Sequence, residues 1–132
     1  MTLEPVTLDR TVLDELLYRA SISPDEEVCG LLFGSGRRID RATATANVAS
    51  DPATAFEVDP AMLIAALRAE RTGGPTLIGH YHSHPRGRAE PSARDRAAAE
   101  PGRLWLILGG GEARLWLAVR GGFAEMELVT DR

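Results

Sequence analysis

The sequence predicts a mixed α/β (α+β) fold in which helices pack on a β-sheet. Apolar residues recur at helical spacing in some segments and as short runs or strict alternation in others, so helices and strands follow one another along the chain. Glycine pairs and a glycine triplet separate the later segments and have the composition of turns, without the spacing of a phosphate-binding loop. The chain has 132 residues, which is enough for one domain with a hydrophobic core, so we expect a single domain over residues 1–132.

The first half of the chain predicts one helix followed by strands. Asp9 is a typical N-cap with leucines at helical spacing behind it, so a helix is expected over residues 10–21. The apolar run at 28–33, closed by Gly-Ser-Gly, predicts a buried strand. Alternating alanine and threonine predict a half-buried strand over 39–49, and a short strand is expected at 56–58.

The second half predicts a helix, a strand, a short helix and a final set of strands. Asp59-Pro60 combines an N-cap with proline at the first helical position, so a helix is expected from there to about Thr72, before Gly73-Gly74. The remaining expected elements are a strand at 76–84, a short alanine-rich helix that opens at Ser92, and strands at 104–108, 113–119 and 123–129.

Composition excludes several classes of function. The formal net charge of −4 argues against non-specific nucleic-acid binding, which needs a basic surface. There is no run of about 18 apolar residues for a membrane span. The N-terminus lacks the basic flank and apolar core of a signal peptide, and the lone Cys29 excludes an internal disulfide. We therefore expect a cytoplasmic protein that binds neither nucleic acid nor membrane.

His82, His84 and Asp95 have the types and spacing of metal ligands. Two histidines two residues apart on a strand point to the same face, about 7 Å apart, so both imidazoles can converge on one cation. Asp95, returned by the following loop and helix, would be the third ligand and would leave the fourth tetrahedral position to water. Such an open site is typical of catalytic zinc, and a single cysteine excludes a thiolate-closed site.

The residues alone leave three alternatives open. His80 lies on the same strand face, so a three-histidine site is also compatible with the spacing. Ser92 and Asp95 also have the spacing of a capping box, and a helix cap and a metal ligand are compatible in one residue. Glu26 and Glu27 are both candidates for the proton shuttle that a hydrolase needs, with no local reason to prefer either.

These motifs together resemble one known family. Glu27-Val28-Cys29-Gly30, then His82-Ser83-His84-Pro85, seven further residues, Ser92, two residues and Asp95 match the pattern of the JAMM (MPN+, JAB domain) zinc metalloproteases. That pattern is Glu, then His-Ser/Thr-His, seven residues, Ser, two residues and Asp. The match is complete, and the order of elements agrees over nearly the whole chain.

The resemblance assigns a role to each matching residue. It implies that His82, His84 and Asp95 bind one Zn²⁺ per chain. It implies that Glu27 is the general acid and base, and that Ser92 assists at the oxyanion. It places the remaining histidine, His80, outside the set of ligands, where it packs against or orients the site.

The resemblance also implies a fold and a reaction. The fold is a curved mixed β-sheet flanked by helices, similar to that of cytidine deaminases, but the Pro-Cys-x-x-Cys motif of those enzymes is absent here. The reaction is hydrolysis of the amide bond after a C-terminal Gly-Gly of a ubiquitin-like protein, by zinc-bound water and a glutamate. The chain resembles compact bacterial members associated with ubiquitin-like sulfur carriers. The alternatives are a non-catalytic MPN-type binding module and a general deubiquitinase-like isopeptidase acting on lysine conjugates.

Overall fold

The computed structural model describes residues 4–131 and contains eight strands and three helices in that range. The helices are α1 (Arg10–Ser21), α2 (Pro60–Arg71) and α3 (Ala93–Ala98). The strands are β1 (Val6–Leu8), β2 (Cys29–Ser35), β3 (Arg38–Thr45), β4 (Leu77–Ser83), β5 (Leu104–Gly109), β6 (Glu112–Val119), β7 (Gly122–Met126) and β8 (Leu128–Thr130). The strands form one sheet in the order β7-β6-β5-β4-β2-β3-β1-β8. Since β4 pairs parallel with β5 and antiparallel with β2, the sheet is mixed, which confirms the predicted fold class.

The sheet is curved until its two edges nearly meet. β7 and β8 are separated only by Glu127, yet they lie at opposite edges of the strand order. β7 pairs with β6, whereas β8 pairs with β1, and the Glu127 carbonyl accepts a hydrogen bond from the Val6 N–H. The predicted continuous strand over 123–129 is therefore wrong, because the chain changes partner strand at Glu127. No strand was predicted at Val6–Leu8, because three residues are too few to show a period of two.

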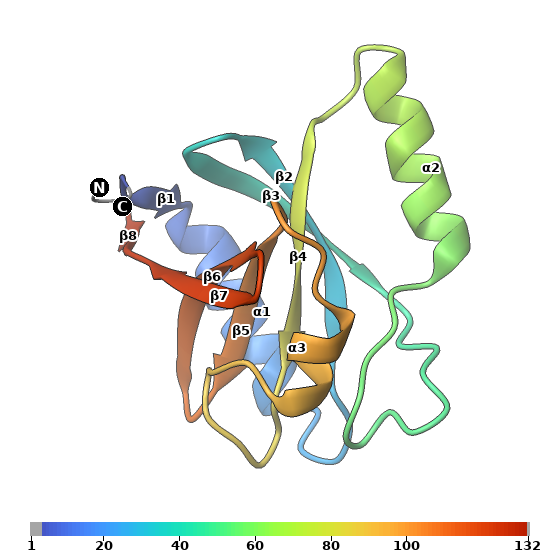
Figure 1. The fold of residues 1–132 in the computed structure, drawn as a ribbon, viewed down its shortest axis with the longest axis vertical. Helices are drawn as coiled ribbons and strands as arrows, with labels where there is room; N and C mark the ends of the chain where they lie inside the picture. The colour runs from blue at the N-terminus through green and yellow to red at the C-terminus, as the bar shows by residue number, and fades with distance from the viewer. Residues whose placement is uncertain (1–3, 132) are drawn as a thin grey trace.

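Alternation along the strands gives the sheet two different faces. One face packs against α1 and holds the larger core, which includes Leu32, Tyr81 and Leu106. The opposite face carries His80 and His82, and further along the same sheet a smaller apolar cluster packs under α2. In Figure 1, α1 lies behind the central strands and α3 lies in front of them. The histidine face is therefore the face that α3 covers.

The helix ends follow the predicted chemistry. Asp9 accepts a hydrogen bond from the Thr11 N–H and begins α1, and Asp59 accepts from the Ala61 N–H and begins α2. The predicted helix at 10–21 is confirmed, and the second predicted helix ends at Arg71, one residue early. None of the helices within residues 4–131 combines the length and the apolar character that a membrane crossing requires.

The segment between β3 and α2 differs from its prediction. β3 ends at Thr45 instead of continuing to residue 49, and the predicted strand at 56–58 is reduced to a single bridge between Asn47 and Val58. The Asn47 side chain explains the difference. Its Oδ1 accepts from the backbone N–H groups of Ala49 and Glu57, and its Nδ2 donates to two carbonyls, so side-chain bonds replace the strand ladder.

Candidate metal centre

Three donor atoms meet at the end of β4. His82 is in the strand and fully buried, His84 follows the strand end, and Asp95 is in the first turn of α3. The two Nε2 atoms are 3.0 Å apart, and Asp95 Oδ2 is 3.2 Å from each of them. Donors bound to tetrahedral zinc at about 2.0–2.1 Å are about 3.3–3.4 Å from one another. The triad therefore fits a zinc ion with little rearrangement.

A backbone carbonyl fixes the tautomer of His84. Its Nδ1 is 2.8 Å from the carbonyl oxygen of Arg88, and because a carbonyl only accepts, Nδ1 carries the hydrogen. In the neutral ring the lone pair is then on Nε2, the atom that faces His82 and Asp95. Metal-binding histidines commonly have such a carbonyl partner on the other nitrogen.

Packing, and not a hydrogen bond to Nδ1, holds the His82 ring on the side away from Asp95. Its ring stacks on Phe56 with the centroids 4.1 Å apart and an interplanar angle of 14°. Its Nδ1 is buried without a hydrogen-bond partner in the described part of the chain. Burial lowers the pKa of His82, despite the opposing effect of Asp95, so the ring stays neutral and keeps a lone pair for a cation.

Asp95 is both a helix cap partner and a candidate ligand. The Ser92 N–H donates to Asp95 Oδ2 at 2.8 Å, and the Asp95 N–H donates to Ser92 Oγ at 3.1 Å, so the predicted capping box is present. Burial alone would raise the pKa of Asp95, but its close contacts with the His82 and His84 rings and the hydrogen bond from the Ser92 N–H hold the pKa far below its usual range. The carboxylate is therefore charged at neutral pH and faces the two imidazoles.

Glu27 is a second acidic residue that the fold brings to this site, beside Asp95. It is only 7% exposed, and one of its oxygens lies within 4.8 Å of a nitrogen on each of His82 and His84. Its Oε1 is buried with no hydrogen-bond partner among residues 4–131. Burial raises its pKa to about 7. Glu26, the alternative shuttle, is exposed and is not among the residues that converge here.

The raised pKa of Glu27 predicts a pH-dependent cost to the stability of the metal-free protein. A carboxyl with a raised folded-state pKa stabilises the fold below its unfolded pKa near 4.5, and this contribution is lost as pH rises through about 7. At roughly 1.4 kcal/mol per pKa unit, the loss at pH 8 is on the order of 3 kcal/mol. Metal-free Glu27→Gln should therefore have a larger free energy of unfolding than wild type at pH 8, but not at pH 4. Urea titrations at both pH values measure the difference, and equal stabilities at pH 8 would contradict it.

Several residues that position this site were given no role in the sequence analysis, although Ser83 is part of the quoted motif. Phe56 supports His82, and Ser83, the residue between the two histidines, accepts a hydrogen bond from the Val28 N–H at 2.9 Å. The Asn47 amide donates to the Glu27 carbonyl at 2.9 Å. These three residues fix the glutamate and one histidine through contacts between distant segments, and no local spacing signals such contacts.

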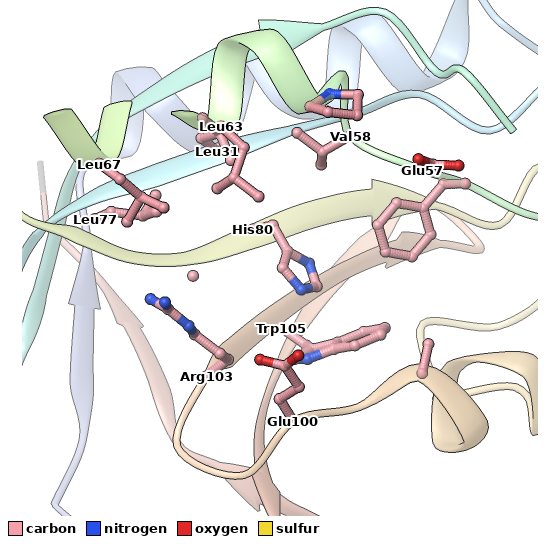
Figure 2. Close-up of a pocket in the computed structure, with 14 residues that line it drawn as sticks. Leu31, Glu57, Val58, Leu63, Leu67, Leu77, His80, Glu100, Arg103 and Trp105 are labelled. Atoms are coloured by element: carbon pink, nitrogen blue, oxygen red, sulfur yellow. The ribbon is translucent and has the colours of Figure 1, made fainter. Parts of the chain in front are cut away.

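His80 and a groove lie beside the donor triad. His80 packs edge-on against Trp105 with the centroids 4.4 Å apart, and Phe56 lies against both His80 and His82. It is not among the described residues whose donor atoms converge. A groove of about 570 Å³ runs from these rings along α2. Figure 2 shows leucines on its α2 side, with Glu100 and Arg103 on the side of Trp105.

The sequence matches a family of known proteins over most of its length. Residues 9–119 match Prok-JAB, described as prokaryotic homologs of the JAB domain. A desampylase of Haloferax volcanii is 38% identical over 100 residues, which span 74% of this chain and 72% of the relative. A Thermus thermophilus protein named "Probable TtuB-protein conjugate cleaving protease" is 36% identical over 100 residues, which span 76% of this chain and 67% of the relative.

Solved structures agree with the fold. A Desulfitobacterium hafniense protein solved in solution has a TM-score of 0.82 at 29% identity and covers 96% of this chain and 93% of its own. A JAB1/MPN domain protein from Archaeoglobus fulgidus has a TM-score of 0.64 at 20% identity, over 98% of this chain and 100% of its own. The second likeness shows the fold alone.

Proposed function

The chain belongs to the prokaryotic homologs of the JAB domain, and we propose on that basis that it is a zinc-dependent JAMM-type isopeptidase. The bond it hydrolyses is the amide after the C-terminal Gly-Gly of a ubiquitin-like protein, with sulfur carriers of that type as the proposed partners. The Thermus thermophilus relative is named for cleaving a protein conjugate, which supports this class of substrate.

The observation that carries the proposal is the geometry of four side chains. His82, His84 and Asp95 present two nitrogen donors and one charged oxygen donor 3.0–3.2 Å apart, which suit one Zn²⁺. Glu27 reaches the same point with a buried oxygen that has no partner in the described structure. A buried carboxylate beside an open metal site is an arrangement that metal-assisted hydrolysis requires.

The mechanism assigns proton transfer to Glu27. A zinc ion held by the three donors would act as a Lewis acid toward the attacking water and the scissile carbonyl. Glu27 takes a proton from the water as the new carbon–oxygen bond forms. It gives this proton to the amine nitrogen as the carbon–nitrogen bond breaks, so the carboxylate returns to its starting state. The Glu27 Oε1 has no hydrogen-bond partner in the described structure, so it is available to take up and release the proton.

Ser92 is proposed to stabilise the oxyanion. Its Oγ accepts a hydrogen bond from the Asp95 N–H, so its own hydrogen is free to donate, and the side chain is exposed toward solvent. Loss of one oxyanion donor costs about 10²–10³-fold in kcat. Ser92→Ala should lower kcat about 100-fold and still bind zinc. Ser92→Thr keeps a hydroxyl for both bonds and is the control; undiminished turnover by Ser92→Ala would refute the role.

The groove beside His80 is proposed to hold the extended tail that precedes the Gly-Gly. One end of the groove is at Phe56 and His80, next to His82, and leucines line its α2 side. Glycines offer mainly backbone, so an extended tail gains affinity when the residues before them bury apolar side chains here.

A substitution on α2 tests the groove. Leu67→Gln should raise KM for a tailed carrier several-fold with kcat little changed, because binding common to the ground state and the transition state is lost. Ile64→Gln changes a 49%-exposed residue of the same helix outside the groove lining and should leave KM unchanged. Equal KM values for the two variants would place the tail elsewhere.

The activity itself is tested with defined substrates. The zinc-loaded protein is incubated with the host's Gly-Gly-ending carriers bearing C-terminal extensions, and with a ubiquitin–lysine isopeptide, and cleavage is measured by intact mass. Cleavage after Gly-Gly in the carrier adducts alone supports the proposal. Cleavage of the ubiquitin isopeptide with equal efficiency favours a general deubiquitinase-like isopeptidase. Zinc binding without cleavage of any adduct would favour a non-catalytic binding module.

A further inference from the structure

Loop 85–91 connects His84 to the N-cap of α3, and its position decides where two of the three donors lie. The loop contains no helix or strand. It packs against the end of β5, where Gly109 leaves no room for a side chain: a Cβ there would lie 2.7 Å from the Arg88 carbonyl carbon. The Arg88 carbonyl is the group that orients His84. A small shift of the loop would therefore move the carbonyl that orients the His84 ring, which is one of the three candidate metal ligands.

Two residues of β6 hold this loop from the side. The Trp116 indole N–H donates to the carbonyl of Ala89 at 3.0 Å, and Ala89 is fully buried. The Arg114 guanidinium donates to the Glu90 carboxylate at 3.0 Å. The loop residues that follow Arg88 are thus bonded in succession to two side chains of one strand.

The same arginine fixes the indole. Arg114 lies over the Trp116 ring, with its guanidinium carbon 4.9 Å from the ring centroid. It also makes a bidentate pair with Glu125 of β7, at 2.7 and 2.6 Å. In the sheet register Glu125 lies directly opposite Trp116, so the three side chains form one layer on the strand face.

We propose that Trp116 is a positioning residue for the metal centre. Its indole N–H holds the Ala89 carbonyl, and this places the adjoining Arg88 carbonyl where it keeps Nδ1 of His84 protonated and Nε2 free. Arg114 supports the indole and has a smaller effect, because its bond to Glu90 is half-exposed and such surface pairs contribute little. The inference rests on the proposed zinc site but not on the proposed substrate.

The test compares zinc affinity in variants of the full chain, by competition with a chelator of known affinity. Trp116→Phe keeps an aromatic ring under Arg114 and removes only the indole nitrogen. Partners beyond the ligands typically contribute 10–100-fold to metal affinity, so Trp116→Phe should bind zinc about 10-fold more weakly. Arg114→Met should lose less zinc affinity than Trp116→Phe, because Arg114 acts through the indole and a half-exposed ion pair. Arg41→Met is the control, because it removes an arginine that lies over another ring, Phe33, on a different strand.

A second measurement separates positioning from stability. Nitrogen-15 NMR of the metal-free protein follows the His84 Nδ1–H, whose exchange with water should be faster in Trp116→Phe than in wild type. If Trp116→Phe keeps both the zinc affinity and the His84 Nδ1–H exchange rate of wild type, the inference is overturned, even if its melting temperature is lower. If Trp116→Phe does not fold, the Arg114→Met variant is used in its place. A zinc affinity of Arg114→Met equal to that of the Arg41→Met control would then overturn the inference. A wild-type protein that binds no zinc overturns the proposed function and this inference together.

Discussion

Glu27→Gln is expected to lower kcat about 10³-fold and to leave zinc affinity nearly unchanged, since general acid–base catalysis contributes about 10²–10⁴-fold. Glutamine has nearly the same shape and fills the same buried space, so His82 and His84 keep their surroundings. An amide cannot take up or release a proton near neutral pH, so both proton transfers assigned to this position are lost. Single-turnover cleavage of a carrier adduct, read by intact mass, measures the rate.

The neighbouring glutamate provides a matched control for this variant. Glu26→Gln makes the same chemical change one residue earlier, at an exposed position. Its kcat should equal that of wild type. Full activity in Glu27→Gln with activity lost in Glu26→Gln would move the proton shuttle to Glu26 and contradict the assignment.

Burying the Glu27 carboxylate without a hydrogen-bond partner costs stability. Its Oε1 has no hydrogen-bond partner in the described structure, and its burial raises the pKa to about 7. A fold selected for stability alone would leave this carboxylate in water or pair it with a base. The metal-free stability difference and the rate difference thus arise from one feature, a buried carboxylate that is held without a partner.

Local chemistry explains the parts of the fold that could be predicted. Asp9 and Asp59 each accept a hydrogen bond from the backbone N–H two residues later, and each helix begins at the residue after its cap. Strand β4 was expected over residues 76–84, after the glycine stop of the preceding helix, and it forms over Leu77–Ser83. In each case the signal and the structure lie within a few residues of each other.

Distant contacts explain the parts that could not be predicted. The break at Glu127 exists because the next three residues pair with β1, which is formed more than 100 positions earlier in the chain. The shortened β3 exists because Asn47 bonds to backbone groups of later residues as far as Glu57. Neither partner is visible in a window of local periodicity.

The candidate site also contains some residues that local patterns identify and others that only distant contacts bring together. The two-residue spacing of His82 and His84 and the helix start before Asp95 are local, so residue patterns alone indicated those three donors. Glu27 lies 55 residues before His82, and only the family resemblance distinguished it from Glu26. The loop contacts of Trp116 come from still further along the chain and correspond to no motif.

Asp95→Asn is expected to weaken zinc binding by more than about 100-fold, because losing even a partner beyond the ligands typically costs 10–100-fold. Asparagine still offers an oxygen to the Ser92 N–H, so the capping box can persist and α3 should remain folded. The substitution keeps the size of the side chain, removes the charge that faces the two imidazoles, and replaces one carboxylate oxygen with an amide NH2 group. It therefore separates the metal role of this residue from its helix-capping role.

The measurement is chelator competition, with circular dichroism to check that the fold is kept. Asp14→Asn, the same change on α1, should bind zinc as tightly as wild type. Lost zinc with a native spectrum fits a ligand that also caps a helix. Zinc held by Asp95→Asn as tightly as by wild type would mean that the carboxylate is only a cap. In that case His82 and His84 would need a third donor, and His80, two residues away on the same strand face, would be the first to test.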